Sequence, residues 1–134
     1  MANTTKIISW ITSIVSALVM LQTLYFKFSA APESVYIFSK LGLEPYGRIG
    51  VGIAELIASI FLIAPKTRFF GALMGIGLML GAIVGHLTKL GIDVMNDGGY
   101  LFILCLIVLV SCLLSLYLER KQLNSFLKTI FASR

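Results

Sequence analysis

The chain has 134 residues, of which 58% are apolar and only 13% are charged, about half the charged share of a soluble domain. This composition excludes an ordinary soluble globular protein, and it excludes a disordered chain, which combines low hydrophobicity with high charge. The net charge of +5 does not indicate nucleic-acid binding, because membrane proteins use cytoplasmic Lys and Arg to set their orientation. We therefore expect an integral membrane protein whose surroundings are the lipid bilayer.

Four apolar stretches predict membrane-crossing helices, at about residues 7–27, 47–64, 69–90 and 99–118. As helices they are each roughly 27–33 Å long, enough to cross the hydrocarbon core. The expected fold is all-α, a four-helix bundle that forms a single membrane domain over residues 1–134. An even number of spans places both termini on one side, which carries seven Lys and Arg residues against four on the other. The positive-inside rule then places both termini in the cytoplasm.

The two outer loops carry local structure signals. Val35, Phe38 and Leu41 recur at helical spacing in the first loop, and Gly42 can end a helix there with a positive φ angle. We expect a short amphipathic helix on the outer surface of the bundle. In the second loop, Asp97 can cap the fourth helix.

The C-terminal tail, residues 119–134, has an amphipathic pattern. Its apolar residues recur on one helical face, and its basic residues fall largely on the other. This pattern predicts a helix lying on an anionic membrane surface; the alternative is a solvated extension of the fourth span. The apolar residues are Leu123, Phe126, Leu127, Ile130 and Phe131.

The third span is rich in glycine, with three pairs spaced four residues apart. Small residues at this spacing let helix backbones approach closely in lipid. We expect packing within the bundle, and a homodimer seam is the alternative. The glycines are Gly71, Gly75, Gly77, Gly81 and Gly85.

Polar residues inside the spans are the candidates for function, because ionisable groups in a membrane are costly and usually face the bundle interior or a wet cavity. Counted from the span ends, all six lie in the outer half, and the inner half is expected to have no comparable set. For two of them, Lys27 and Lys89, we favour the role of ordinary anchors whose charges reach the membrane surface. The six are Gln22, Lys27, Arg48, Glu55, His86 and Lys89.

The spacing of residues in the second span singles out two members of this set, Arg48 and Glu55. Arg48, Gly52 and Glu55 lie on one stripe of the helix, so Arg48 can lean inward toward Glu55, or both can meet the polar head of a ligand. A structural pair is the other interpretation, with Glu55 bonded to Gln22, His86 or Arg48 and joining helices. The two interpretations remain open.

Several chemistries have no support in the sequence. With a single histidine and no acid within a turn of it, neither a Ser–His–Asp arrangement nor a structural zinc site is indicated, and we expect no metal. Cys105 and Cys112 lie about 10 Å apart along one helix, too far for a disulfide, and we expect buried thiols.

The sequence resembles the DoxX-like family of small four-span membrane proteins, with the specific similarity in the Gly-Arg to Glu segment and the His-Leu-Thr segment. The resemblance implies a four-helix bundle in a bacterial inner membrane whose polar core includes Gln22, Lys27, Arg48, Glu55 and His86. Members of this family are linked to quinone-coupled sulfur oxidation, to membrane redox complexes and, in animal relatives, to receptor assembly. The matching segments are residues 21–28, 41–45, 47–56, 86–91 and 97–99.

Two functions follow as hypotheses. The first is a binding protein or redox-complex subunit that holds a lipophilic molecule with a polar head, such as a quinone or another lipid, in an outer-half pocket. Glu55 and His86 would bond the head group or relay protons, while Arg48 and Lys27 would set the local field. The second is a non-catalytic assembly factor or complex subunit that acts through helix contacts with a membrane protein partner. In both cases an accessory subunit is favoured over an enzyme acting alone.

Overall fold

The computed structural model describes residues 2–132, which form six α-helices and one short π-helix and contain no strand. The predicted class is confirmed: an all-α membrane bundle with a short helix in the first long loop and an amphipathic helix at the C-terminal end. The elements are α1 (Ala2–Phe28), α2 (Pro32–Lys40), α3 (Tyr46–Ile63), α4 (Arg68–Gly85), η1 (His86–Leu90), α5 (Tyr100–Leu118) and α6 (Lys121–Ala132).

Four segments are long and apolar enough to cross a membrane, namely Asn3–Phe28, Tyr46–Ile63, Arg68–Leu90 and Tyr100–Leu118. The third segment joins α4 to the π-helix η1. Their outward faces carry large exposed apolar side chains, which lipid chains cover in a bilayer. The protein is therefore a multi-pass membrane protein.

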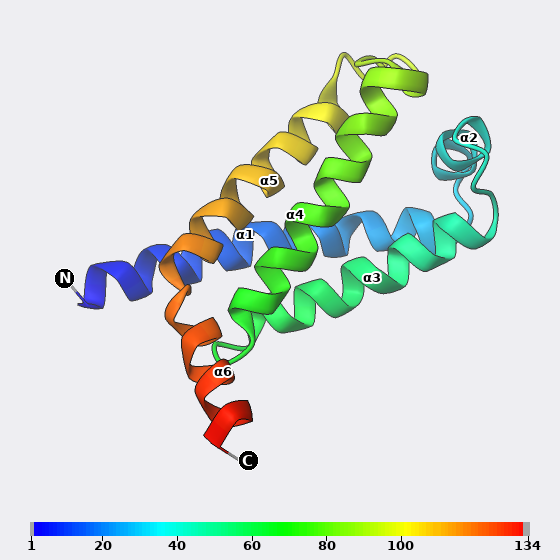
Figure 1. Cartoon of the computed structure of the whole chain (residues 1–134). Coiled ribbons are helices and arrows are strands. Elements are labelled where there is room, and N and C mark those ends of the chain that lie inside the picture. Colours follow the sequence, from blue (N-terminus) through cyan, green and yellow to red (C-terminus); the bar gives the residue numbers. More distant parts are fainter. Residues whose placement is uncertain (1, 133–134) are drawn as a thin grey trace.

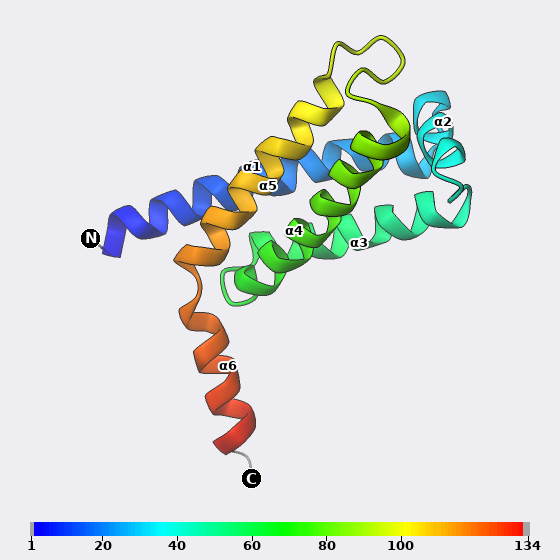
Figure 2. The ribbon, with the colours of Figure 1, turned by 45° about the horizontal axis from the view of Figure 1, so that its top comes forward.

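The four spans form a ring in which α1 packs on α3 and α5, and α4 packs on the same two helices. Figures 1 and 2 show two helix pairs, α1 with α3 and α4 with α5, that diverge toward α2 and the loop after η1. We call this the loop end. The N-terminus, the α3–α4 turn and the start of α6 lie at the opposite end, which we call the terminal end (Figure 1).

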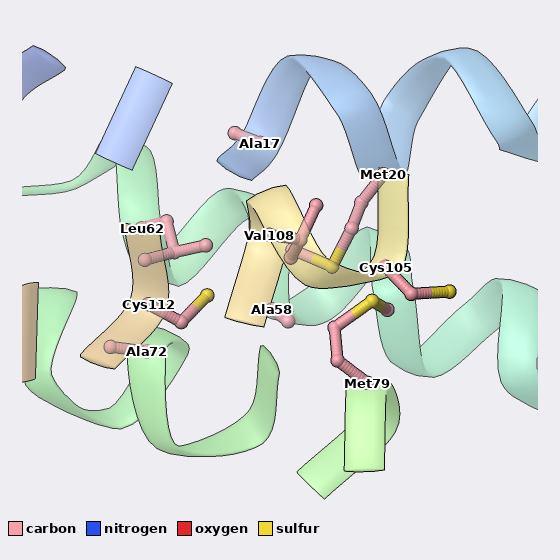
Figure 3. Close-up of a cluster of buried hydrophobic side chains, with 9 residues drawn as sticks. All are labelled: Ala17, Met20, Ala58, Leu62, Ala72, Met79, Cys105, Val108 and Cys112. Atoms are coloured by element: carbon pink, nitrogen blue, oxygen red, sulfur yellow. The ribbon is translucent and has the colours of Figure 1, made fainter. Parts of the chain in front are cut away.

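The middle of the bundle is a dry apolar layer to which all four spans contribute (Figure 3). Sulfur-containing side chains fill much of it, and both cysteines in it are buried free thiols. Such side chains are polarizable and adapt to irregular gaps. The layer separates polar groups at the two ends of the bundle. Its residues are Ala17, Met20, Ala58, Leu62, Ala72, Met79, Cys105, Val108 and Cys112.

The glycines of α4 have unequal surroundings. A Cβ atom added at Gly71 would lie 2.6 Å from the backbone nitrogen of Leu62, and one at Gly75 would lie 2.6 Å from Sγ of Cys112. These two glycines therefore bring α4 close to α3 and α5. A Cβ at Gly77 or Gly81 would meet no atom within 4 Å among the described residues outside the local helix backbone.

Helix α6 leaves the bundle at the terminal end (Figure 2), and none of its described side chains is buried. Its first turn is fastened by Gln122, whose Oε1 accepts a hydrogen bond from the backbone nitrogen of Phe69 at 2.9 Å and whose Nε2 donates to the Pro65 carbonyl. Phe126 also packs edge-on against Phe70, with ring centroids 5.2 Å apart. Gln122 thus satisfies one N–H at the start of α4, which lacks a side-chain cap of its own.

Candidate functional site at the loop end

A cavity of about 490 Å³ lies at the loop end. Its walls come from α1, α3, α4 and α5, and α2 and the loop after η1 cover it. Most lining groups are apolar, among them Val19, Leu78 and Leu104. Gly77 and Gly81 line it as well, so the missing side chains on this stretch of α4 leave room for the cavity.

The polar part of the cavity is centred on Glu55 of α3 and Lys27 of α1. Lys27 Nζ lies 3.0 Å from Glu55 Oε2, and both side chains are largely buried, with 13% and 6% of their surface exposed. Thr23 supports the pair: its hydroxyl lies 3.2 Å from the same carboxylate oxygen and accepts a hydrogen bond from Lys27 at 3.0 Å. The partner of Glu55 is therefore Lys27, and not Gln22, His86 or Arg48, which one of the two open interpretations had suggested. Lys27 is not a simple surface anchor, because its long side chain extends back along α1 to the acid.

Arg48 has a different role in the structure. Its Nε donates to both carboxylate oxygens of Glu44, at 2.8 and 3.0 Å, and its Nη1 donates to the backbone carbonyl of Lys27. This guanidinium therefore satisfies a carbonyl in the last turn of α1 and fixes the start of α3 beside it. Although Arg48 is buried, it does not line the cavity, and it does not lean toward Glu55 as the stripe on α3 suggested.

His86 is held by the π-helix that ends the third span. Its Nδ1 lies 2.8 Å from the carbonyl oxygen of Gly91, and the Gly91 nitrogen donates back to the His86 carbonyl at 2.8 Å. Gly91 has a φ of +79°, which glycine adopts without steric cost. The ring also packs edge-on against Phe102 at 5.4 Å, and the residue is only 2% exposed. The imidazole thus lines the cavity in a fixed orientation.

Further polar groups border the cavity, and Gln22 and Asp97 are two of them. Gln22 lines it from α1 and is exposed. Asp97, which sequence reasoning assigned only to capping, also lines it and caps α5 as expected, accepting the Leu101 N–H at 3.1 Å. Desolvation acts to raise the pKa of Asp97, but hydrogen bonds from the backbone N–H groups of Val94, Leu101 and Gly99 outweigh it and lower that pKa below its usual value.

The terminal end has its own buried polar cluster, which corrects the expectation that one half of the membrane lacks such groups. Arg68 of α4 is 2% exposed; its Nη1 lies 3.5 Å from Glu119 Oε1 and its Nε donates to the Leu62 carbonyl at 2.9 Å. Its guanidinium also stacks on the ring of Trp10 at 4.2 Å. The sequence did not predict that Arg68 is buried. It lies at the edge of a turn, where a charged side chain is normally solvated and needs no partner.

Hydroxyl groups extend the terminal cluster between α1 and α5. Ser9 donates to Glu119, Thr12 lies 2.6 Å from Ser115, and Ser13 lies 3.2 Å from Ser115. These hydroxyls are buried and bonded across helices, as is common where helices pack in lipid. Serine and threonine change the hydropathy of a span only slightly, so the sequence did not predict that these residues form a polar cluster.

The loop end and the terminal end therefore offer different chemistry. Among residues 2–132, no three His, Cys, Asp or Glu side chains are grouped so that they could hold a metal ion. The cavity instead combines apolar walls with a carboxylate, an ammonium and an imidazole, which are groups that form hydrogen bonds with a polar molecule. The terminal cluster is packed among helices.

Comparison with known proteins places the sequence in one family. The sequence profile of the DoxX-like family matches residues 11–115, a stretch that contains most of each span and nearly all of the cavity lining. No curated protein and no solved structure gave a match.

Proposed function

Since the chain belongs to the DoxX-like family, we propose that it binds a lipophilic molecule with a polar head in the loop-end cavity, as a subunit of a membrane redox system. A quinone is the candidate we put forward, on the basis of the family resemblance. The location we propose is a bacterial inner membrane, with both termini in the cytoplasm. The distribution of Lys and Arg supports this orientation.

The cavity is the observation that carries this proposal. Its volume of about 490 Å³ falls within the range of small-molecule sites, which are mostly apolar with a few converging polar groups. Here the apolar walls could hold a hydrocarbon tail or ring, while Glu55, Lys27 and His86 meet the head. Because the cavity lies within membrane-crossing helices, we expect its ligand to come from the lipid phase.

The ion pair gives a second argument. Burying a charge in a membrane is costly, and such residues usually serve a substrate or proton pathway. Lys27 and Glu55 offset each other's charge, so the site favours a head group that is neutral overall. A head group beside this pair can accept a hydrogen bond from Lys27 or donate one to Glu55.

The test is native mass spectrometry of the protein released in mild detergent, with the extracted small molecules identified. We expect a bound lipophile that is lost in Glu55→Gln. Gly81→Leu is the matched steric test, because Gly81 lines the cavity and a Cβ atom added there meets, in the described chain outside its own helix backbone, no atom within 4 Å. Gly50→Leu is its control, since Gly50 is equally open but lies outside the cavity.

Loss of the lipophile in Gly81→Leu and its retention in Gly50→Leu would support the cavity as the binding site. An empty wild-type protein that co-purifies with a stoichiometric membrane partner would instead support the assembly-factor function. Bulk phospholipid alone, held equally by the wild type and its three variants, would refute the binding proposal.

A further inference from the structure

We propose that the ligand of the loop-end cavity carries at least one hydroxyl group, which donates a hydrogen bond to Nε2 of His86 or to Oε1 of Glu55. This inference rests on the proposed binding function and specifies the chemistry of the head group. It follows from which atoms of these two cavity-lining side chains are already bonded and which have no partner in the part of the protein that the structure describes.

The first step is the position of the proton on His86. The partner of Nδ1 is the Gly91 carbonyl oxygen at 2.8 Å, and a carbonyl oxygen can only accept, so Nδ1 carries the hydrogen. In a neutral imidazole the other nitrogen, Nε2, then has a lone pair and is an acceptor. The reciprocal bond from the Gly91 nitrogen to the His86 carbonyl holds the Gly91 backbone beside the ring, and a ring that turned over would lose the bond from Nδ1.

The second step is the unused oxygen of Glu55. Its Oε2 receives Lys27 and Thr23, at 3.0 and 3.2 Å. Within residues 2–132, Oε1 of Glu55 and Nε2 of His86 have no hydrogen-bond partner in the protein. Both residues are more than nine-tenths buried, at 5% and 2% exposure, and both line the cavity.

Two unbonded acceptors in a buried site set a preference among ligands. A buried polar group left without a partner costs the full loss of its hydration, so a ligand that donates is favoured over one that only accepts. Lys27 still has one N–H beyond its bonds to Glu55 and Thr23, and this can serve an accepting group on the same head. The hydroxyl of Ser34, which also lines the cavity, both donates and accepts and so adds no preference.

For a quinone, this preference selects one form of the molecule. The oxidised form has carbonyl oxygens, which only accept, whereas the reduced form has two hydroxyl groups, which donate. We therefore expect the cavity to hold the reduced form more tightly. The same argument applies to any other lipophilic alcohol or phenol.

The experiment compares two probes that differ only at the hydroxyl, 4-dodecylphenol and its methyl ether, 4-dodecylanisole. Binding of each to the intact protein in detergent is titrated by native mass spectrometry. Sites built to bond a hydroxyl reject analogues that lack it, and we expect the phenol to bind about tenfold more tightly or better. His86→Phe should reduce this ratio, and Glu55→Gln provides a second variant if His86→Phe does not fold.

Lys89→Met is the matched control, because Lys89 belongs to the same π-helix but lies outside the cavity, and it should keep the wild-type ratio. Equal binding of the two probes, or tighter binding of the ether, would overturn the hydroxyl inference and leave the binding function intact. A ratio unchanged in both His86→Phe and Glu55→Gln would overturn it as well. Binding of neither probe would overturn the inference together with the proposed function.

Discussion

Both ends of the bundle hold a cation paired with a carboxylate, and they differ in what surrounds the pair. At the terminal end Arg68 and Glu119 lie 3.5 Å apart among hydroxyls of tightly packed helices. At the loop end Lys27 and Glu55 lie 3.0 Å apart beside a cavity of about 490 Å³. The terminal pair joins helices, whereas the loop pair also has an unused carboxylate oxygen beside open space.

The comparison shows that a buried charge in a membrane span does not by itself mark a binding site. Arg68 is the more completely buried of the two cations, and its partners are the protein's own carbonyl, hydroxyl and carboxylate groups and an aromatic ring. What distinguishes Glu55 is the space next to it. Charge, burial and cavity have to coincide before a binding role is inferred.

The largest expected effect tests the structural role of the terminal pair. Arg68→Met removes a buried guanidinium that bonds the Leu62 carbonyl and Glu119, and hydrogen bonds made by a charged group are worth about 1.5–3 kcal/mol each. Lys27→Met should cost less, because the cavity of about 490 Å³ beside Glu55 has room for water that can hydrate the carboxylate. The free energy of unfolding in mixed detergent micelles measures both, and equal losses would contradict the distinction between the two ends.

A smaller effect on the free energy of unfolding distinguishes glycines that pack against a neighbouring helix from glycines that line the cavity. Gly71→Ala places a Cβ within 2.6 Å of the α3 backbone, and such overpacking costs about 1–3 kcal/mol. Gly81→Ala meets nothing and should be neutral or stabilising by up to about 1 kcal/mol, since alanine favours helix. The same unfolding measurement decides this, and a destabilised Gly81→Ala would show that Gly81 contacts something outside the described fold.

The smallest effect concerns Asp97 on the rim of the cavity. Its pKa is lower in the folded protein than in the unfolded chain, so its stabilising contribution is complete above the unfolded value of about 3.9. That contribution is lost as the pH falls through the lower, folded pKa. Unfolding free energies between about pH 5 and about pH 2 should fall less steeply in Asp97→Asn than in the wild type. Parallel curves would refute the role of this carboxylate.

Much of the fold could be predicted from the sequence, because it is encoded in patterns of residues that are close together in the chain. Long apolar runs defined the spans, and the spacing of Val35, Phe38 and Leu41 indicated α2. Gly42 adopts the positive φ, +75°, that was expected after it, and Asp97 caps α5.

The site was only partly accessible, because it depends on contacts between distant segments. Depth along the helices directed attention to Glu55, His86 and Gln22, which all line the cavity. It could not show that the long Lys27 side chain, and not Arg48, reaches the acid. The pairs Gly71/Gly75 and Gly77/Gly81 have the same spacing, and only the position of neighbouring helices makes one pair a contact and the other a cavity wall.

The bond between Arg68 and Glu119 also has a consequence for biogenesis. The two residues are separated by 51 positions, so when Arg68 emerges from the ribosome its carboxylate partner has not yet been synthesised. Until α5 has been inserted, the polar partners of Arg68 are the Leu62 carbonyl and the Ser9 hydroxyl, and its charge stays hydrated by lying near the headgroups. We therefore expect α4 to sit shallowly during insertion and to reach its final depth only when α5 arrives, making closure of the bundle a late step of assembly.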